Sequence, residues 1–239
     1  MKEKNDEVFS NNLVWVIGIA AVLVLFNQVM LFQISSALGA PALGSTSTSI
    51  KTFSNGDLES VDVTQLKSTA QTVAAVIDLS DAKDAQGVIN AMIPQGQPEY
   101  YKELGISYDD PVKALQFLAY ELYPRIKQDV SQNNPEVWNR YLALATTPVG
   151  ISCEYCCGVG PISINAKGDL TCGCSHAPAI HAVTLYLMQS TDMTDAEVLR
   201  EAMRWKALWF PKNMVEIGMK ISGGDASVLN DVPTMVGGC

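Results

Sequence analysis

Five of the six cysteines and both histidines of this 239-residue chain lie between positions 153 and 181. They form two groups, Cys153-Glu-Tyr-Cys156-Cys157 and Cys172-Gly-Cys174-Ser-His176, and His181 follows the second. Thiolate sulfur and imidazole nitrogen are the ligands that zinc, copper(I) and iron–sulfur clusters take from proteins. The clustering predicts a site for zinc, copper or iron, or for an iron–sulfur cluster. The candidate ligands are Cys153, Cys156, Cys157, Cys172, Cys174, His176 and His181.

The residues between the two cysteine groups predict a β-hairpin that spans residues 151–176. Val159 to Ile164 carries β-branched residues in rough alternation, Asn165 to Gly168 has the composition of a turn, and Leu170-Thr171 leads back to the second group. The open ends of a hairpin lie close together, so the hairpin would bring the two cysteine groups face to face.

Within this arrangement the ligands differ in rank. Cys153, Cys156, Cys172 and Cys174 have the spacing of a tetrahedral four-sulfur site, and Cys157 is left as a spare or as the bridge in a larger cluster. His176 is the best nitrogen candidate, because it follows Cys174 by two residues, and His181 is the second. Cys239 is expected to stand apart, because Gly237 and Gly238 leave it untethered.

Disulfides and a catalytic thiol are the competing interpretations of the same cysteines. The neighbours Cys156 and Cys157 cannot easily bond to each other. Cys172 and Cys174 would diverge on a strand, so both pairs would have to bridge across the hairpin. Covalent attachment of haem is excluded at this point, because that chemistry needs the sequence C-x-x-C-H and Cys157 follows Cys156.

These residues also resemble a known family. Cys172-Gly-Cys174 with a near-following His176, beside the run Tyr155-Cys156-Cys157-Gly158, is similar to the cysteine-rich extracytoplasmic proteins named for their PCYCGC motif. Thr171 stands where that motif has a tyrosine, and the chain has no Pro-Cys pair. The resemblance is confined to residues 153–181. It implies a thiol-rich protein outside the membrane, often attached to it, and it implies no reaction.

The first 60 residues predict a membrane anchor and a spacer. Residues 11–38 hold an uninterrupted apolar run from Leu13 to Phe26 and, after Asn27-Gln28, a second mainly apolar run to Leu38. The stretch is long enough to span a bilayer as a helix, with Trp15 and Phe32 near the two ends. Lys2 and Lys4 precede the span, which places residues 1–10 in the cytoplasm. Residues 39–60 are rich in Gly, Ser and Thr and read as a linker. A cleaved signal peptide and the packing helix of a pilin-like filament subunit are the alternatives.

Residues 61–239 predict a mainly α extracytoplasmic domain of about six or seven helices around the single hairpin. Asp110-Pro111 and Asn134-Pro135 are helix starts, a buried helix opens near Ser175, and Thr194 to Glu197 is a capping box. Pro124 is expected to kink or end the helix that contains it. On the helix after Thr194, the residues expected to face solvent are Arg200, Glu201, Arg204 and Lys206.

Composition narrows the function classes. The formal charge is −9 and the basic residues are scattered, so the chain lacks the electrostatic footprint of a nucleic-acid-binding protein. The sequence has no phosphate-binding loop, nucleophile elbow or H-E-x-x-H motif, and an enzyme is unsupported. We therefore expect a membrane-anchored, extracytoplasmic metal-binding protein that handles a metal or transfers electrons. The alternative is a structural or interaction module with disulfide staples, and a protein partner or a homo-oligomer stays open.

Overall fold

The computed structural model describes residues 58–66, 68–146, 151–152, 154–155, 162–223 and 236–237. The chain separates into two compact units, Met1–Ser49 and Ile50–Cys239, and every described residue belongs to the second. The predicted cytoplasmic tail, the predicted membrane helix at 11–38 and the linker up to residue 57 lie outside the described residues. Within the described ranges, no helix is long and apolar enough to cross a membrane.

The described part of the chain is mainly α, as the sequence predicts. Two short 3₁₀ turns, Leu58–Ser60 and Val63–Gln65, lead into the helices α2 (Thr69–Val76), α3 (Ala85–Met92), α4 (Tyr101–Leu104), α5 (Pro111–Gln116), the π-helical segment η3 (Phe117–Leu122), α6 (Tyr123–Asn133), α7 (Pro135–Thr146), α8 (His176–Ser190), α9 (Asp195–Trp209) and α10 (Pro211–Ser222).

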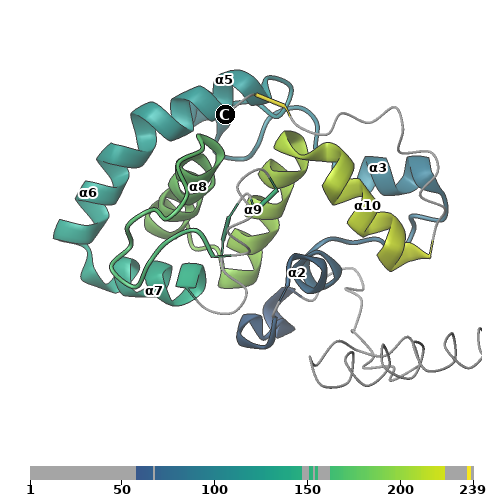
Figure 1. Cartoon of the computed structure of the whole chain (residues 1–239), viewed down its shortest axis with the longest axis horizontal. Coiled ribbons are helices and arrows are strands. Elements are labelled where there is room, and N and C mark those ends of the chain that lie inside the picture. Colours follow the sequence, from purple (N-terminus) through teal and green to yellow (C-terminus); the bar gives the residue numbers. More distant parts are fainter. Residues whose placement is uncertain are drawn as a thin grey trace, which may run out of the picture. The chain divides into compact units, whose positions relative to one another are not determined.

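Helix α8 lies at the centre of one half of the core. It packs against η3, α6, α7 and α9, and Figure 1 shows it enclosed by these elements. Its side chains are buried on almost every side, which confirms the prediction of a buried helix without a polar face. Helix α9 also packs against α2 and α10, and α10 packs against α3. Helices α8 and α9 therefore form the centre of the described core, and Cys172 and Cys174 directly precede α8.

The predicted helix starts are confirmed by their caps. The Asp110 side chain accepts a hydrogen bond from the backbone N–H of Lys113 at 3.2 Å, and Asn134 caps α7 in the same way. Thr194 and Glu197 form the reciprocal capping box that opens α9. Each side-chain oxygen satisfies an N–H group that has no partner inside its helix.

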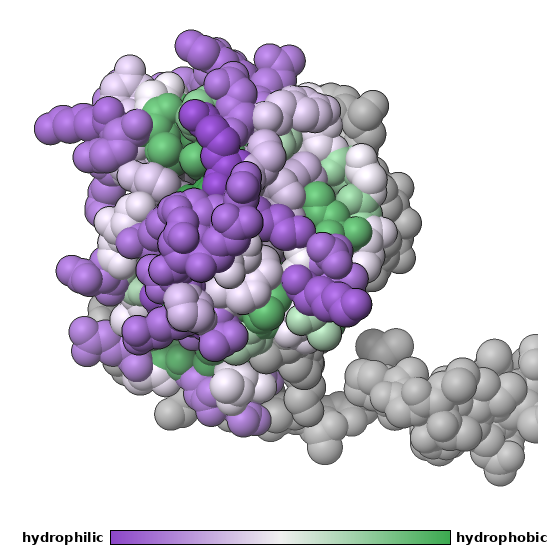
Figure 2. All heavy atoms as spheres, turned by 90° about the vertical axis from the view of Figure 1, so that its left-hand side faces the viewer, coloured by the Kyte–Doolittle hydropathy of each residue, from purple (hydrophilic) through white to green (hydrophobic). Residues whose placement is uncertain are grey.

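Pro124 was predicted to kink or end its helix, and the structure shows that the helix does not end there. Helices α5 and α6 are continuous through η3, where the N–H of Tyr123 bonds to the carbonyl of Leu118, five residues back. A proline supplies no N–H and its ring crowds the preceding turn. A wider π turn before Pro124 accommodates the ring, so the chain stays helical. Figure 2 shows the face of the molecule that carries α6 as largely hydrophilic, in keeping with a helix that buries one side only.

The predicted hairpin is reduced to a tight turn. In the described part of residues 151–176 there is no strand, only a single antiparallel bridge between Ile164 and Leu170. The turn itself is as predicted, because Gly168 has φ of 80° and donates to the Asn165 carbonyl at 2.9 Å. A Cβ at Gly168 would lie 2.5 Å from the Trp138 ring, so the turn sits directly on α7. Packing on helices replaces strand pairing.

Helix α9 is buried where the sequence predicts solvent. Lys206 and Glu201 are almost fully buried, and Arg204 is only half-exposed. Helices α8 and α2 cover α9 from different sides, so its polar residues face protein. Glu201 accepts hydrogen bonds from the hydroxyls of Tyr100 and Tyr108. A buried carboxylate needs such partners, and the arrangement ties the loops around α4 to α9.

Candidate functional site

The structure describes four of the seven predicted ligands. Cys172 and Cys174 lie immediately before α8, His176 is its first residue, and His181 lies one and a half turns further along it. The other three predicted ligands, Cys153, Cys156 and Cys157, lie outside the described residues. We call the five residues Glu154, Tyr155, Cys172, Cys174 and His176 the thiol region.

The sulfurs of Cys172 and Cys174 lie 3.4 Å apart, and both residues are buried. The expectation that this pair diverges on a strand is wrong, because residues 172–174 are not in a strand and Cys174 lies in a bend. A disulfide bond is about 2.05 Å long. Two thiolates bound at about 2.3 Å to one tetrahedral zinc ion lie roughly 3.8 Å apart. At 3.4 Å the Cys172 thiol donates a hydrogen bond to the Cys174 sulfur, and the two residues are not joined by a disulfide.

His176 is held by aromatic rings and by the carboxy-terminal segment. Its ring centroid lies 4.7 Å from that of Phe210 and 5.7 Å from that of Trp209, at the end of α9. Its Nε2 lies 3.1 Å from the carbonyl oxygen of Val236, and the Val236 N–H donates to the Trp209 carbonyl at 2.8 Å. The preceding residue, Ser175, exchanges a hydrogen bond with the hydroxyl of Tyr120, which η3 presents at 2.6 Å. The start of α8 is thus fixed from three directions.

The first cysteine group is held by the buried side chain of Lys206. Its Nζ donates to the Glu154 carboxylate at 2.9 Å and to the Thr69 hydroxyl at 3.2 Å, and Thr69 also donates to Glu154 at 2.5 Å. Lys206 is only 1% exposed. Glu154 has φ of 41°, in the left-handed region that residues other than glycine rarely adopt. The ion pair therefore fixes a strained residue between Cys153 and Cys156.

Tyr155 adds an aromatic anchor to the same group. The centroid of the Tyr155 ring lies 5.1 Å from the centroid of the Phe210 ring and 5.0 Å from the Lys206 ammonium. The Tyr155 hydroxyl donates to the Met214 sulfur at 3.3 Å. Burial raises the pKa of Tyr155 well above its usual range, so the phenol keeps its proton. Tyr155 and His176 therefore both pack against the ring of Phe210.

His181 belongs to a closed hydrogen-bond network. Its Nδ1 lies 2.9 Å from the hydroxyl of Tyr141, and its Nε2 lies 2.7 Å from the hydroxyl of Ser163. Ser163 donates its own proton to the carbonyl of Ile151 at 2.9 Å. Ser163 must then accept from Nε2–H, and Nδ1 accepts from Tyr141. Burial, with a smaller contribution from the Lys127 charge, lowers the pKa of His181 to about 3, so the ring is neutral.

The His181 network also contacts the backbone that precedes the first cysteine group. Ile151 lies two residues before Cys153, and its carbonyl is the end point of the chain of hydrogen bonds from His181 through Ser163. Both ring nitrogens of His181 are therefore hydrogen-bonded to protein groups. Its role there is to hold the backbone that leads into Cys153.

Sequence reasoning missed Lys206, Phe210 and Val236. Lys206 was assigned to the wet face of its helix, and a buried partner for it could have been suspected only from the lone carboxylate of Glu154 inside the cysteine group. Phe210 sits between two helices and carried no signal of its own. Val236 contributes backbone atoms, which every residue has, so no residue type marks it.

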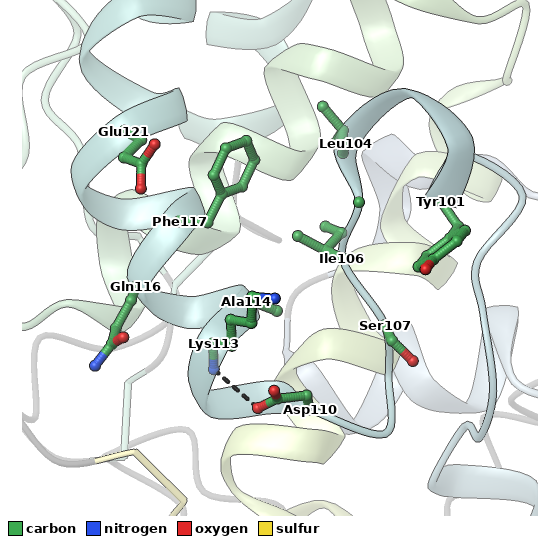
Figure 3. Close-up of a pocket in the computed structure, with 11 residues that line it drawn as sticks. Tyr101, Leu104, Ile106, Ser107, Asp110, Lys113, Ala114, Gln116, Phe117 and Glu121 are labelled. Carbon is green, nitrogen blue, oxygen red and sulfur yellow. Dashed lines mark hydrogen bonds between the residues drawn. The ribbon is translucent and has the colours of Figure 1, made fainter.

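The pockets in the described residues lie elsewhere. One pocket of about 380 Å³ opens beside α4 and α5, and Figure 3 shows the residues that line it. Two of its polar groups have structural partners: Ser107 donates to the Gly96 carbonyl at 2.7 Å, and Asp110 is the cap of α5. Two further pockets, of about 430 and 240 Å³, share Arg200 and Glu197 near the start of α9. None of these three is lined by a cysteine or a histidine.

Within the described ranges, no three His, Cys, Asp or Glu side chains come together closely enough to hold a metal ion. Of the four predicted ligands that the structure describes, only Cys172 and Cys174 have their donor atoms in contact with each other. Comparison of the chain with protein-family models, with curated proteins and with solved structures found no match.

Proposed function

We propose that this chain is a membrane-tethered, extracytoplasmic protein that binds a soft metal ion, or a metal–sulfur cluster, through its cysteines and His176. The observation that carries the proposal is the pair of buried sulfurs of Cys172 and Cys174, 3.4 Å apart, which His176 follows at the start of α8. Two sulfurs at this distance suit ligands of one ion, and soft ligands of this kind select zinc, copper(I) or iron–sulfur clusters.

The anchoring of the first cysteine group supports the same function. A residue in the left-handed region costs about 1–3 kcal/mol and persists only where its surroundings impose it. Glu154 is in that region and is held by Lys206 and Thr69, while Tyr155 is held by Phe210. Backbone strain and several anchoring contacts at the residues between Cys153 and Cys156 are expected of a segment that must present side chains in a fixed direction.

The ligand set we propose is Cys153, Cys156, Cys172 and Cys174, with Cys157 and His176 as further ligands of a larger site. His181 is left out of the set, because Tyr141 and Ser163 engage both of its nitrogens. The helix α8 starts at His176, and the positive end of its dipole favours anionic sulfur at the two preceding cysteines.

The choice of metal separates two roles for such a site. Zinc has no redox chemistry and would make the site structural or a store of the ion, whereas copper or an iron–sulfur cluster would permit electron transfer. A site outside the membrane, held on a linker from residues 39–60, suits the capture of an ion or the exchange of electrons with a partner at the membrane surface.

The test is a measurement of metal and cysteine oxidation in one preparation. The full chain is purified in detergent without chelator under inert gas, and metals are quantified per chain by mass spectrometry alongside reduced cysteines titrated after denaturation. We expect at least one equivalent of zinc, copper or iron, with the ligand cysteines reduced. A metal-free protein with oxidised cysteines would contradict the proposal and support disulfide staples.

Serine variants identify the ligands within the same assay. Cys172→Ser and Cys174→Ser should each abolish stoichiometric metal and lower the melting temperature, because ligand loss removes binding free energy that is also folding free energy. Cys239→Ser is the matched control, since it removes one thiol without touching either cysteine group. Equal loss of metal in Cys239→Ser and Cys174→Ser would show that the site is not closed within residues 153–181.

The tether is tested separately. We expect the full chain to stay with membranes after extraction at alkaline pH, and a chain without residues 1–38 to be released. A protease added outside sealed cells should digest the domain after residue 39 while sparing residues 1–10. Release of the full chain at alkaline pH would contradict the membrane anchor without bearing on the metal site.

A further inference from the structure

Two of the pockets lie against helix α9 and meet at Arg200, which lines both. The larger, of about 430 Å³, is enclosed by α4, the end of α8 and the start of α9. The smaller, of about 240 Å³, is lined by residues 97–100, Tyr108 and the next turns of α9. We call the two together the α9 cleft and each pocket one of its lobes. The residues that line both lobes are Glu99, Tyr100, Met193, Glu197 and Arg200.

Arg200 differs from the other arginines of the chain in having no partner in the described residues. Arg204 pairs with Glu201 at 3.3 Å, Arg140 pairs with Asp195 at 2.7 Å, and Arg125 donates to a backbone carbonyl at 2.7 Å. Arg200 forms no ion pair with the described carboxylates, and its Nε is buried without a hydrogen-bond partner. A buried N–H without an acceptor is unfavourable, and the fork of a guanidinium matches a carboxylate. Arg200 therefore has its charge and donors available for an anionic group of a ligand.

The larger lobe also carries carboxylates that no lysine or arginine neutralises. Glu99, Glu103 and Asp192 line this lobe, are exposed, and form no ion pair within the described part of the chain. Glu197 lines it too, but its carboxylate is used by the capping box with Thr194. Because carboxylates outnumber the single guanidinium here, the lobe attracts a positively charged group.

Tyrosine rings form the apolar walls of the cleft. The centroids of the Tyr100 and Tyr186 rings lie 6.0 Å apart in the larger lobe, and the face of such a ring attracts an ammonium group. The Tyr100 hydroxyl donates to Glu201 at 2.6 Å and accepts from the Trp205 indole N–H at 2.6 Å. Tyr108 donates to the same Glu201 carboxylate from the smaller lobe. This network fixes the walls before a ligand arrives, which lowers the entropy cost of binding.

We propose that the α9 cleft binds a small zwitterion of the amino-acid type. The Arg200 guanidinium takes its carboxylate, the unpaired carboxylates of the larger lobe take its ammonium, and its apolar part lies against Tyr186 and Tyr100. A simple anion would be repelled by the surplus of carboxylates, and a simple cation would leave Arg200 without a partner. The inference does not rest on the proposed metal site, because no predicted metal ligand lines either lobe.

The first experiment compares three charge forms of one probe. L-Phenylalanine is the zwitterion, N-acetyl-L-phenylalanine keeps only the carboxylate, and L-phenylalanine amide keeps only the ammonium. Isothermal titration calorimetry of the full chain in detergent with a chelator measures their affinities, and L-leucine and L-methionine vary the apolar part. We expect the zwitterion to bind roughly tenfold tighter than either derivative, because each derivative loses one charge-assisted contact. Failure of all three amino acids to bind at millimolar concentration, or equal affinities of the three phenylalanine forms, would overturn the inference.

Arg200→Gln tests the carboxylate end of the site. The variant should lower the affinity for L-phenylalanine by about tenfold or more and leave the melting temperature of the free protein unchanged, because no described protein group pairs with Arg200. Arg125→Gln is the matched control: it removes the same charge from α6, outside the cleft, and should bind as the wild type does. Unchanged affinity in Arg200→Gln, with a lowered melting temperature, would make Arg200 a structural residue and contradict the proposed site.

The double variant Glu103→Gln, Asp192→Asn tests the ammonium end. It should weaken the binding of L-phenylalanine and strengthen that of N-acetyl-L-phenylalanine, since the charge that attracts an ammonium also repels a lone carboxylate. Glu59→Gln with Asp81→Asn removes the same charges at exposed positions that do not line the cleft, and it should change neither affinity. Equal effects of the two double variants would reduce the result to net charge and sink the inference. With the chelator present and every cysteine retained, such a failure leaves the metal-binding proposal untouched.

Discussion

The two histidines of α8 lie five residues apart on one helix and have opposite surroundings. His181 is enclosed by Tyr141 and Ser163, which engage both of its nitrogens, and its network ends at a backbone carbonyl. His176, which is equally buried, is the first residue of the helix; it packs on Phe210, and its Nε2 lies 3.1 Å from the Val236 carbonyl oxygen. His181 is therefore held by two side-chain hydroxyls, whereas His176 is held by aromatic rings and a backbone carbonyl.

The difference follows from what surrounds each ring and not from the residue type. His181 faces elements close to the hairpin turn, α6 and α7, which the core needs in any case. His176 faces Trp209 and Phe210 at the junction of α9 and α10, and the backbone carbonyl of Val236. The comparison predicts that changes around His181 alter stability and leave metal binding intact, whereas changes around His176 alter metal binding more than stability.

The largest effect is expected at Lys206, which secures the first cysteine group. Lys206→Met removes the buried ammonium and leaves the Glu154 carboxylate without its ion-pair partner. Breaking a buried pair from one side costs about 3 kcal/mol, the lower end of the usual range, because the Glu154 side chain keeps 16% exposure. Urea unfolding measures the loss. Adding Glu154→Leu should restore part of the stability; a double variant no more stable than Lys206→Met would show that the ion pair is not the cause.

The next effect is the pH dependence that His181 imposes. In the unfolded chain His181 takes up a proton below about pH 6.5, and in the folded chain only below a pKa of about 3. The unfolded state therefore binds more protons between these values, and stability falls as the pH falls through this window. From pH 7.5 to 5 the loss attributable to this residue is roughly 2 kcal/mol. His181→Asn should lack this part of the pH dependence, and an unchanged slope in that variant would contradict the assignment.

A smaller effect is expected from Tyr141→Phe, which tests the same network from its other side. The variant removes the hydroxyl that donates to Nδ1 of His181 and leaves a buried acceptor unsatisfied. We expect a loss of about 1–2 kcal/mol in unfolding free energy. Metal content per chain should stay at the wild-type value. A loss of metal would mean that the His181 network and the thiol region are not separable.

The smallest effect on stability is expected from His176→Gln in the metal-free protein. The amide of glutamine keeps a donor for the Val236 carbonyl but loses ring contacts with Trp209 and Phe210, which are worth about 1 kcal/mol. Zinc affinity should nevertheless fall, because an imidazole ligand is gone. Competition titration with a chelator of known affinity measures it. Wild-type affinity in His176→Gln would remove His176 from the ligand set and sharpen it to sulfur alone.

Local sequence signals predicted much of the helical frame. Asp110-Pro111, Asn134-Pro135 and the box from Thr194 to Glu197 act within a few residues, because a cap bonds N–H groups of its own first turn. The turn at Asn165–Gly168 is local in the same sense. These features are decided by neighbours along the chain, and the structure confirms them.

The sequence by itself also gathered the chemistry, since it places five cysteines and both histidines in one stretch. Only the tertiary structure decided what each does. Lys206 is buried because α2 and α8 cover α9, His181 is engaged because Tyr141 and Ser163 meet it from different segments, and Val236 reaches His176 across the fold. Burial and hydrogen-bond pairing depend on which surfaces close over a residue. The spacing of residues along the chain does not encode this directly. Histidine is therefore part of a structural hydrogen-bond network at position 181 and a proposed ligand at position 176.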